Sequence, residues 1–287
     1  MKKIFFTFLG VIGMATILNA QEINSKNGFA YLPEGEEFAI GIDATPIFNF
    51  FGNMVKINSG APFADPSAFN FTNGNNAIYG KYFVDANTAY RGSIRIGMTT
   101  FKDKNYVMQD GQADPLVTVE DMGKVSDRNI VLSAGMEKRR GKNRLQGFYG
   151  AEFGIMLAGG KNSFEYGNGY TTTNTAPTIT DFSGSLGVVN DLGGGARVTE
   201  EKLGGTFGLG LRAFVGVEYF IMPKISVGGE FGWGLQIASQ GEGELSLEYW
   251  DIANSTIKTQ TTKTAGGGFS GFDTDNVGGN IFMMFHF

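Results

Sequence analysis

The segment YRGSIRIGMT, from Tyr90 to Thr99, shows the alternation that decides the fold of this chain. One parity is apolar and the other is polar or charged, with Tyr90, Ile94, Ile96 and Met98 set against Arg91, Ser93 and Arg95. Because side chains of a β-strand alternate between two faces, this segment predicts a strand with one apolar and one charged face. A single strand of this kind fits many folds, so the number of repeats matters.

The same period of two returns in seven further segments, at 38–50, 78–85, 129–140, 146–157, 207–220, 225–238 and 276–287. Each apolar face spans about ten residues, the length of a tilted strand that crosses a membrane. No segment after residue 20 resembles a transmembrane helix, so a membrane protein of this kind would cross with strands. The repeats predict an all-β chain.

The connections between these segments alternate in length. Short connections lie at 86–88, 141–144 and 222–224, and long ones at 51–77, 102–127, 158–205 and 239–276. This layout predicts a transmembrane antiparallel up-and-down β-barrel of eight strands, with short periplasmic turns and long external loops. The segment 244–263 reads as a hairpin, and a barrel of ten strands is the alternative if that hairpin spans the membrane. Its second arm has no apolar face, so we expect it to project above the membrane.

The face opposite the apolar one carries charges of both signs. An eight-stranded barrel has an interior that side chains just fill, and unpaired charge there is costly. We therefore predict a lumen charge network made of Asp43, Lys81, Asp85, Arg91, Arg95, Glu137, Glu152, Arg212, Glu218 and Glu230. Arg139 shares this face, and inward glycines such as Gly232 leave room for long side chains. A soluble sandwich with a solvated charged face is the alternative, which the large apolar face disfavours.

Residues 1–20 read as a secretory signal peptide, with Lys2 and Lys3 before an apolar run that ends at Leu18. A membrane anchor is the alternative, but the run is short for a span of about 20 residues. We then expect a short periplasmic segment at 21–36 and the barrel at 37–287. Aromatic girdles are expected at the two membrane interfaces, from Phe48 and Phe50 at one rim and Tyr82, Tyr90 and Tyr219 at the other.

Composition excludes several classes of protein. The formal net charge is −5, and it falls to −7 when Lys2 and Lys3 leave with the signal peptide, which argues against a nucleic-acid partner. The chain has no cysteine, so an exported form must be stable without disulfides. Neither a cofactor nor a metal is predicted. Asp273 and Asp275 resemble the start of a calcium loop, but the remaining ligands of that pattern are missing.

With its signal peptide, eight alternating strands and terminal FMMFHF, the chain resembles the small outer-membrane barrels of Gram-negative bacteria, the OmpA/OmpX/OmpW-like group. The segment 211–235, LRAFVGVEYFIMPKISVGGEFGWGL, looks like the penultimate hairpin of such barrels, especially Bacteroidetes ones. The resemblance implies a place in the outer membrane with loops at the cell surface. It also implies that Met283, Phe285 and Phe287 form a C-terminal signal read by the barrel-assembly machinery.

Function follows less sharply from these patterns. His286 is the only histidine and no nucleophile–base cluster is evident, so no enzyme is predicted. We expect a monomeric barrel with a structural, adhesive or partner-binding role, in contact with membrane lipid and lipopolysaccharide. The acidic residues of 240–276 would bind cations or a surface protein. The alternatives are a narrow porin and a lipid-acting enzyme, and the porin is disfavoured if the inward charges pair.

Overall fold

The computed structural model describes residues 24–25, 28, 30–44, 77–274 and 280–287. The predicted signal peptide at 1–20 and the girdle residues Phe48 and Phe50 lie outside the described residues. Those described form an all-β, antiparallel structure, which confirms the all-β and antiparallel part of the predicted fold. None of their helices has the length and apolar character needed to cross a membrane.

The strands differ widely in length. They are β1 (Phe38–Asp43), β2 (Ile78–Asp85), β3 (Thr88–Met108), β4 (Thr118–Lys142), β5 (Leu145–Glu165), β6 (Arg197–Lys202), β7 (Thr206–Met222), β8 (Ile225–Gln240), β9 (Gly243–Asp251), β10 (Thr256–Thr264), β11 (Gly267–Thr274) and β12 (Asn280–His286). A short helix, α3 (Ser183–Leu186), lies between β5 and β6.

Strand pairing closes into a ring. It runs from β1 through β2, β3, β4, β5, β7 and β8 to β12, and β12 pairs again with β1. Two strands share the same edge of β8: β12 pairs with its residues 225–230, and β11 pairs with its residues 233–240. At the junction, the Phe38 amide donates to the Phe287 carbonyl at 3.2 Å, and the Phe287 amide donates back at 2.7 Å. Ring closure therefore leaves β1 and β12 without a free edge there.

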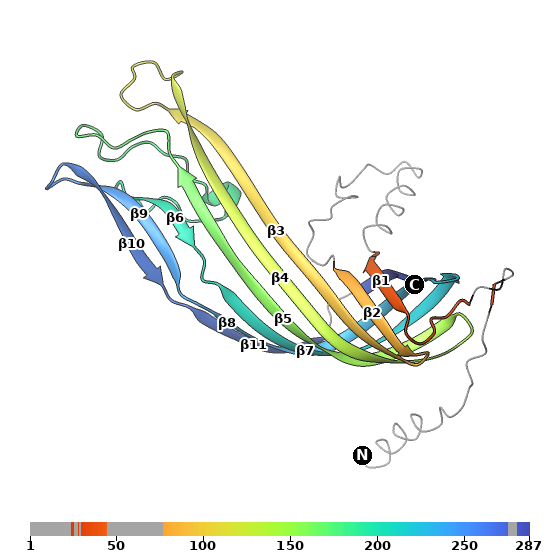
Figure 1. Ribbon diagram of the computed structural model, residues 1–287. Coiled ribbons are helices and arrows are strands. Elements are labelled where there is room, and N and C mark those ends of the chain that lie inside the picture. The colour runs from red at the N-terminus through yellow and green to blue at the C-terminus, as the bar shows by residue number, and fades with distance from the viewer. Residues whose placement is uncertain (1–23, 26–27, 29, 45–76, 275–279) are drawn as a thin grey trace, which may run out of the picture.

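Tight turns join β2 to β3, β4 to β5 and β7 to β8 at one end of the ring, here called the short-turn end (Figure 1). Asn143 and Lys224 have positive φ angles of 58° and 62° in two of these turns. From this end β3, β4 and β5 extend far beyond β1 and β2, so the molecule is tall on one side (Figure 1). The connections 109–117, 166–196 and 252–255 lie at the opposite end.

The predicted long connections were wrong in their bounds. Residues 102–127 and, outside the predicted hairpin, 239–276 were expected as loops, but β3 and β4 occupy most of the first range and β11 part of the second. β5 likewise continues to Glu165. The cause is physical: backbone pairing extends a strand where both faces are polar, and such a strand carries no apolar alternation to detect. The hairpin β9–β10 forms, and in the described residues it pairs with β6 instead of entering the ring.

The two faces of the ring differ sharply. Large apolar side chains are exposed on the outer face of every strand of the ring, among them Ile40, Ile78, Ile96, Leu132, Phe153, Leu211, Trp233 and Phe285. The inner face buries an aromatic cluster of Phe83, Phe148, Phe214, Phe282 and Met284 with Ala39 and Ala89. Apart from this inner cluster, the ring differs from a typical water-soluble protein, because large apolar side chains are exposed around its whole outer face.

The connection 166–196 packs against the inner face of the tall side. Phe182 and Leu186 lie over Gly123 of β4, and Phe182 joins Phe164 and Val198 in a second buried cluster. The buried Asp121 carboxylate accepts from the Gly167 and Thr180 amides at 2.8 and 2.7 Å. This loop is therefore a fixed part of the structure.

Residues 30–37 cross the short-turn end. Tyr31 and Pro33 are buried there, and the Arg144 guanidinium lies 3.9 Å from the centre of the Tyr31 ring. The Lys224 ammonium pairs with Glu37, and the Glu36 amide donates to the Phe83 carbonyl at 2.7 Å. These contacts place the segment, here called the N-terminal strap, across one opening of the ring.

Candidate functional site: a buried charge network

The inner face of the ring holds four basic and four acidic side chains in mutual contact. We call this set the buried charge network, and it consists of Lys81, Arg91, Arg139, Arg212, Glu137, Glu152, Glu218 and Glu230. Its members come from β2, β3, β4, β5, β7 and β8. Their formal charges cancel, which is the condition for burying so many charges together.

The half of the network nearest the short-turn end is built on two fully buried carboxylates. Glu218 forms an ion pair with Arg139 at 2.7 Å and accepts a hydrogen bond from the Lys81 ammonium at 3.4 Å. Glu137 accepts from the same two cations, at 2.8 Å from Arg139 and 3.0 Å from Lys81. Two anions therefore share two cations, so each charge has more than one partner.

The other half joins Arg91 and Arg212 to Glu152 and Glu230. Arg91 binds Glu230 through both terminal nitrogens, at 2.8 and 3.2 Å, and its Nε lies 3.3 Å from Glu152. Arg212 donates to Glu152 at 2.9 Å and to Glu230 at 2.8 Å. Arg91 also lies 3.6 Å from Glu137, which connects the two halves.

Glycine on neighbouring strands makes room for these side chains. Gly135 lies between Arg91 and Glu152 in the register, and a Cβ on Gly135 would come within 2.6 Å of the Glu152 Cβ. A Cβ on Gly232 would lie 2.6 Å from the Arg212 Nε. Alternating glycine with a long charged residue therefore lets the interior fill without collision.

Aromatic rings pack against the cations of the network. Arg91 lies 4.1 Å from the centre of the Phe214 ring, and Lys81 lies 4.8 Å from that of Phe148. Arg139 lies 5.2 Å from the centre of the Phe83 ring. Such contacts favour a cation that has left water. Between the network and the short-turn end the interior is thus occupied by rings and ion pairs.

The structure brings seven of the ten predicted network residues together, namely Lys81, Arg91, Glu137, Glu152, Arg212, Glu218 and Glu230, with Arg139 as the eighth member. Asp43 is also buried on the inner face, at the end of β1. Arg95 is half-buried on the inner face of β3 and lies over Gly97, outside the network.

Asp85 was wrongly assigned to the interior. It is exposed and accepts from the Asn87 amide at 2.7 Å in the turn that follows β2. The register of β2 on β3 shifts between Phe83 and Asp85. Extrapolating the alternation to Asp85 therefore fails, because the strand ends and the chain turns.

His286 is buried and contacts Ser226 and Glu218, a cluster that sequence reasoning missed. Its Nε2 lies 3.1 Å from the Ser226 hydroxyl and 3.3 Å from a Glu218 oxygen. A hydrolytic triad needs the acid on one ring nitrogen and the nucleophile on the other, whereas both groups here approach Nε2. The shared parity of Phe282, Met284 and His286 was the available signal for its burial. The cluster extends the network toward the short-turn end.

Above the network, toward the tall side, a cleft of about 660 Å³ remains. Arg212 and Glu152 form part of its lining, together with Ser93, Ser133, Gln236 and Phe269. The side chains of Arg212 and Glu152 are 19% and 12% exposed, so this is where the network meets solvent. Within the described residues, no cluster of three acidic, histidine or cysteine side chains could hold a metal ion.

The predicted rim residues lie on the outer face. Tyr82 is opposite Tyr90 in the register and 4.9 Å from Phe38 between ring centres, and Tyr219 is exposed near the same end. Phe285 and Phe287 are exposed and Met283 is half-buried. They alternate along the strand with the buried Phe282, Met284 and His286. The outward tyrosines thus gather toward the short-turn end.

Comparison with known proteins gives no further guide: no protein-family model matches the chain, and no curated protein does. The function is therefore argued from the geometry of the ring and of its interior.

Proposed function

We propose that the chain is an integral outer-membrane β-barrel of eight strands. Its interior is closed by the buried charge network, and its tall side presents an ordered surface to partners outside the cell. This role is structural or adhesive and involves no catalysis. The resemblance to small OmpA/OmpX/OmpW-like barrels, the signal-peptide pattern and the terminal aromatic residues agree with this assignment.

The observation that carries the proposal is the inverted distribution of side chains around the ring. The outer face of β3 is apolar from Tyr90 to Met98, which rises about 27 Å at roughly 3.4 Å per residue. At the usual tilt of about 40° this gives about 20 Å along the membrane normal, close to the apolar band of about 25 Å in known barrels. Exposed apolar area on this scale needs a lipid or protein cover.

Pairing of the inward charges supports a closed interior over a porin. A water-filled channel leaves its charged residues accessible to ions, whereas Lys81 is almost fully buried and pairs with the fully buried Glu137 and Glu218. The aromatic cluster fills the space beside them. A continuous aqueous path past these groups would require the ion pairs to separate, at a high cost in free energy.

The two tryptophans provide the experiment that tests membrane insertion. Trp233 is 41% exposed on the outer face of β8, whereas Trp250 lies in β9, outside the ring. The variants Trp250→Phe and Trp233→Phe each keep a single tryptophan. After folding into vesicles with brominated acyl chains, we expect strong quenching of Trp233 fluorescence and little quenching of Trp250.

Equal, weak quenching of both tryptophans, in protein that has folded by circular dichroism, would rule out a membrane barrel. Quenching of Trp250 alone would place the membrane at the wrong level of the molecule. Folding in urea-free buffer as a monomer without lipid or detergent would also contradict the proposal, because the exposed apolar face would then have no cover.

A narrow channel is the second candidate, favoured by the cleft of about 660 Å³ that reaches the network. The two functions differ in planar bilayers. A closed barrel gives no stable conductance steps at high protein occupancy. Stable, salt-dependent steps would favour the channel, and Arg212 and Glu152 would then be the first candidates for ion selectivity.

A further inference from the structure

Five basic residues gather on the outer face of the tall side, just beyond the apolar surface. We call them the basic patch: Lys102, Lys124, Arg128, Lys161 and Lys202, on β3, β4, β5 and β6. Each shares the outward parity of its strand, as Lys102 does with Met98 and Lys161 with Leu157. Arg128 lies directly opposite Met98, so the patch begins where the apolar surface ends.

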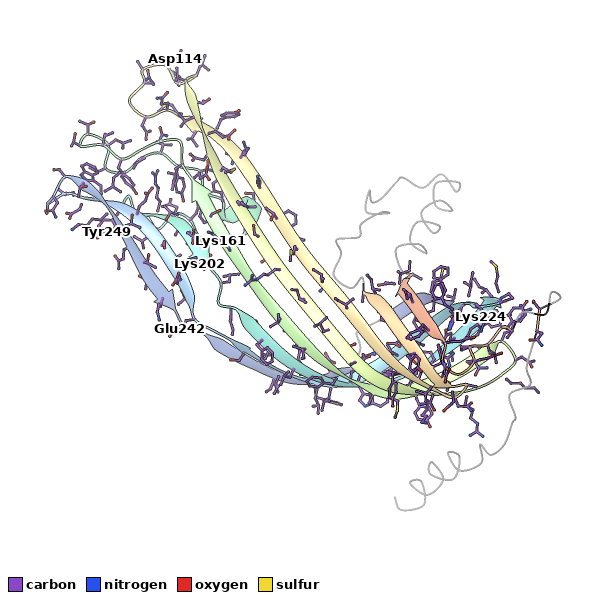
Figure 2. The ribbon with its side chains drawn as sticks, in the orientation of Figure 1. Asp114, Lys161, Lys202, Lys224, Glu242 and Tyr249 are labelled. Carbon is purple, nitrogen blue, oxygen red and sulfur yellow. The ribbon has the colours of Figure 1, made fainter. Side chains whose placement is uncertain are left out.

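The strand register forces like charges together within the patch. Lys102 lies directly opposite Lys124 on β3 and β4, and Lys161 lies directly opposite Lys202 on β5 and β6 (Figure 2 labels the second pair). Like charges in directly opposed positions of an antiparallel pair destabilise it. Two such pairs on neighbouring strands indicate that an anion compensates them.

Among the described residues, carboxylates compensate only one of the two pairs. Glu200 lies 2.7 Å from Lys161 and 3.4 Å from Lys202, and Glu244 lies 3.0 Å from Lys202. In the described part of the chain, Lys102, Lys124 and Arg128 have no carboxylate within 4.0 Å. Three outward cations thus lie together with no anionic partner among the residues that the structure describes.

A groove of about 450 Å³ lies at one side of the basic patch. Arg128, Lys161 and Lys202 line it, and the Arg128 guanidinium lies over Gly159, which has no side chain to fill the space. The Thr100 and Ser126 hydroxyls, 3.1 Å apart, also contribute to the lining, and Met98 adds an apolar wall. One carboxylate, Asp127, also lines the groove, so its three cations outnumber its one anion. An excess of cations, hydroxyl donors and an apolar wall suit a group with a phosphate at one end and a hydrocarbon chain at the other.

We propose that the basic patch binds the phosphate of an anionic lipid headgroup in the leaflet that surrounds the tall side. The inference rests on the proposed membrane insertion and adds a specific lipid site to it. Continuity with the apolar surface selects lipid as the occupant, because the acyl chains of a bound lipid would lie along Met98, Ile96 and Leu157. Exposed carboxylates, including Glu242 and Glu244, occupy the neighbouring β8–β9 side, so the patch is confined to one sector.

The test compares thermal unfolding of the mature protein in phosphatidylcholine vesicles with and without phosphatidylglycerol. We expect phosphatidylglycerol to raise the Tm of the wild type by about 2–4 °C or more. The variant Lys102→Gln/Lys124→Gln should lose this gain. In phosphatidylcholine alone its Tm should equal or exceed that of the wild type, because a repulsive pair has been removed. A variant that has a lower Tm than the wild type only when phosphatidylglycerol is present has lost a binding site, whereas a folding defect would lower its Tm in both lipids.

Two further variants serve as controls. Lys102→Arg/Lys124→Arg keeps both charges and should keep the gain. Arg140→Gln/Lys142→Gln makes the same charge change on exposed residues of β4 at the short-turn end. An equal loss in that control would reduce the effect to general electrostatics and overturn the site. Inorganic phosphate giving the wild type the same gain in phosphatidylcholine would assign the patch to free phosphate and overturn the lipid assignment.

Tryptophan quenching in the same vesicles separates the two proposals. A chain that fails to insert overturns membrane insertion together with the lipid site. A chain that inserts but has the same Tm with and without phosphatidylglycerol overturns the lipid site alone.

Discussion

At the scale of single residues, Glu218 shows most clearly how the interior is held together. It is fully buried and contacts Arg139, Lys81, Ser226 and His286. Glu218→Gln leaves two cations without part of their compensation, and removing one partner of a buried ion pair costs about 3–5 kcal/mol. We expect that loss in the free energy of unfolding, measured by urea titration in vesicles. Glu242→Gln, which breaks the exposed pair with Lys263, is the control and should cost less than about 1 kcal/mol.

Gly216 provides a second prediction at this scale. A Cβ at this position would lie 2.3 Å from the Phe148 ring and 2.6 Å from the Gly229 carbonyl oxygen. We expect Gly216→Ala to destabilise the folded state by about 1–3 kcal/mol in the same titration, as overpacking of a filled core does. Gly80→Ala is the matched control, because a Cβ there has no atom within 4 Å among the described residues. Equal stability of the two variants would contradict a tightly filled interior.

Seven of the ten predicted network residues were predictable because the alternation of side chains along a strand decides by itself which residues face inward. The predicted set could not include Ser226 or His286 on charge grounds, since neither carries a charge in its usual state at neutral pH. It placed Asp85 inside because alternation does not reveal where a strand ends. Which cation meets which anion also lay beyond the sequence, since that depends on the register between strands far apart in the chain.

At the scale of secondary-structure elements, the tip of the β9–β10 hairpin is fixed by Asp251. Lys258 pairs with its carboxylate, which also accepts from Asn254 at 2.6 Å and from the Ala253 amide at 3.0 Å. The hydrogen bond from Lys258, followed by that from Asn254, lowers the pKa of Asp251 from 3.8 to about 2. Because the folded pKa is lowered, the contribution to hairpin stability is complete above pH 3.8 and is lost as the pH falls toward 2.

A carboxyl-carbon NMR titration measures this pKa directly. We expect a midpoint for Asp251 near pH 2 in the wild type and a higher midpoint in Lys258→Met, which removes the largest cause of the shift. A wild-type midpoint at the ordinary value of 3.8 would show that the hairpin tip does not hold these contacts in solution.

Element lengths show where sequence reasoning stops. The alternation of apolar and polar residues locates β3 between Tyr90 and Thr99, yet the strand continues to Met108. In the added part, Lys102 and Lys104 face one side and Asp103 and Asn105 the other, so neither face is apolar. The pairing with β4 holds this part in extended conformation, and a long-range pairing cannot be detected in the segment itself.

At the scale of the whole molecule, the unlike ends of the ring predict an orientation. The chain has no cysteine, so single cysteines report their own position. With the tall side outside the cell, Asn254→Cys should react with an impermeant maleimide in intact cells. Lys142→Cys, at the end of β4 beside the turn at the opposite end, should react only after the outer membrane is opened. The reverse pattern would invert the proposed orientation, and equal labelling of both in intact cells would contradict a membrane location.

The buried charge network also constrains the register of the strands, which the apolar outer surface does not. A strand that slips by two residues keeps every apolar side chain on the outer face, so lipid contact alone does not reject that error. The interior does, because a two-residue slip of β5 on β7 moves Glu152 from Arg212 to Gly210 or Phe214. Such a slip would leave the largely buried Glu152 without Arg212 opposite it, and an unpaired buried charge is costly, so the ion pair favours the observed alignment of β5 and β7.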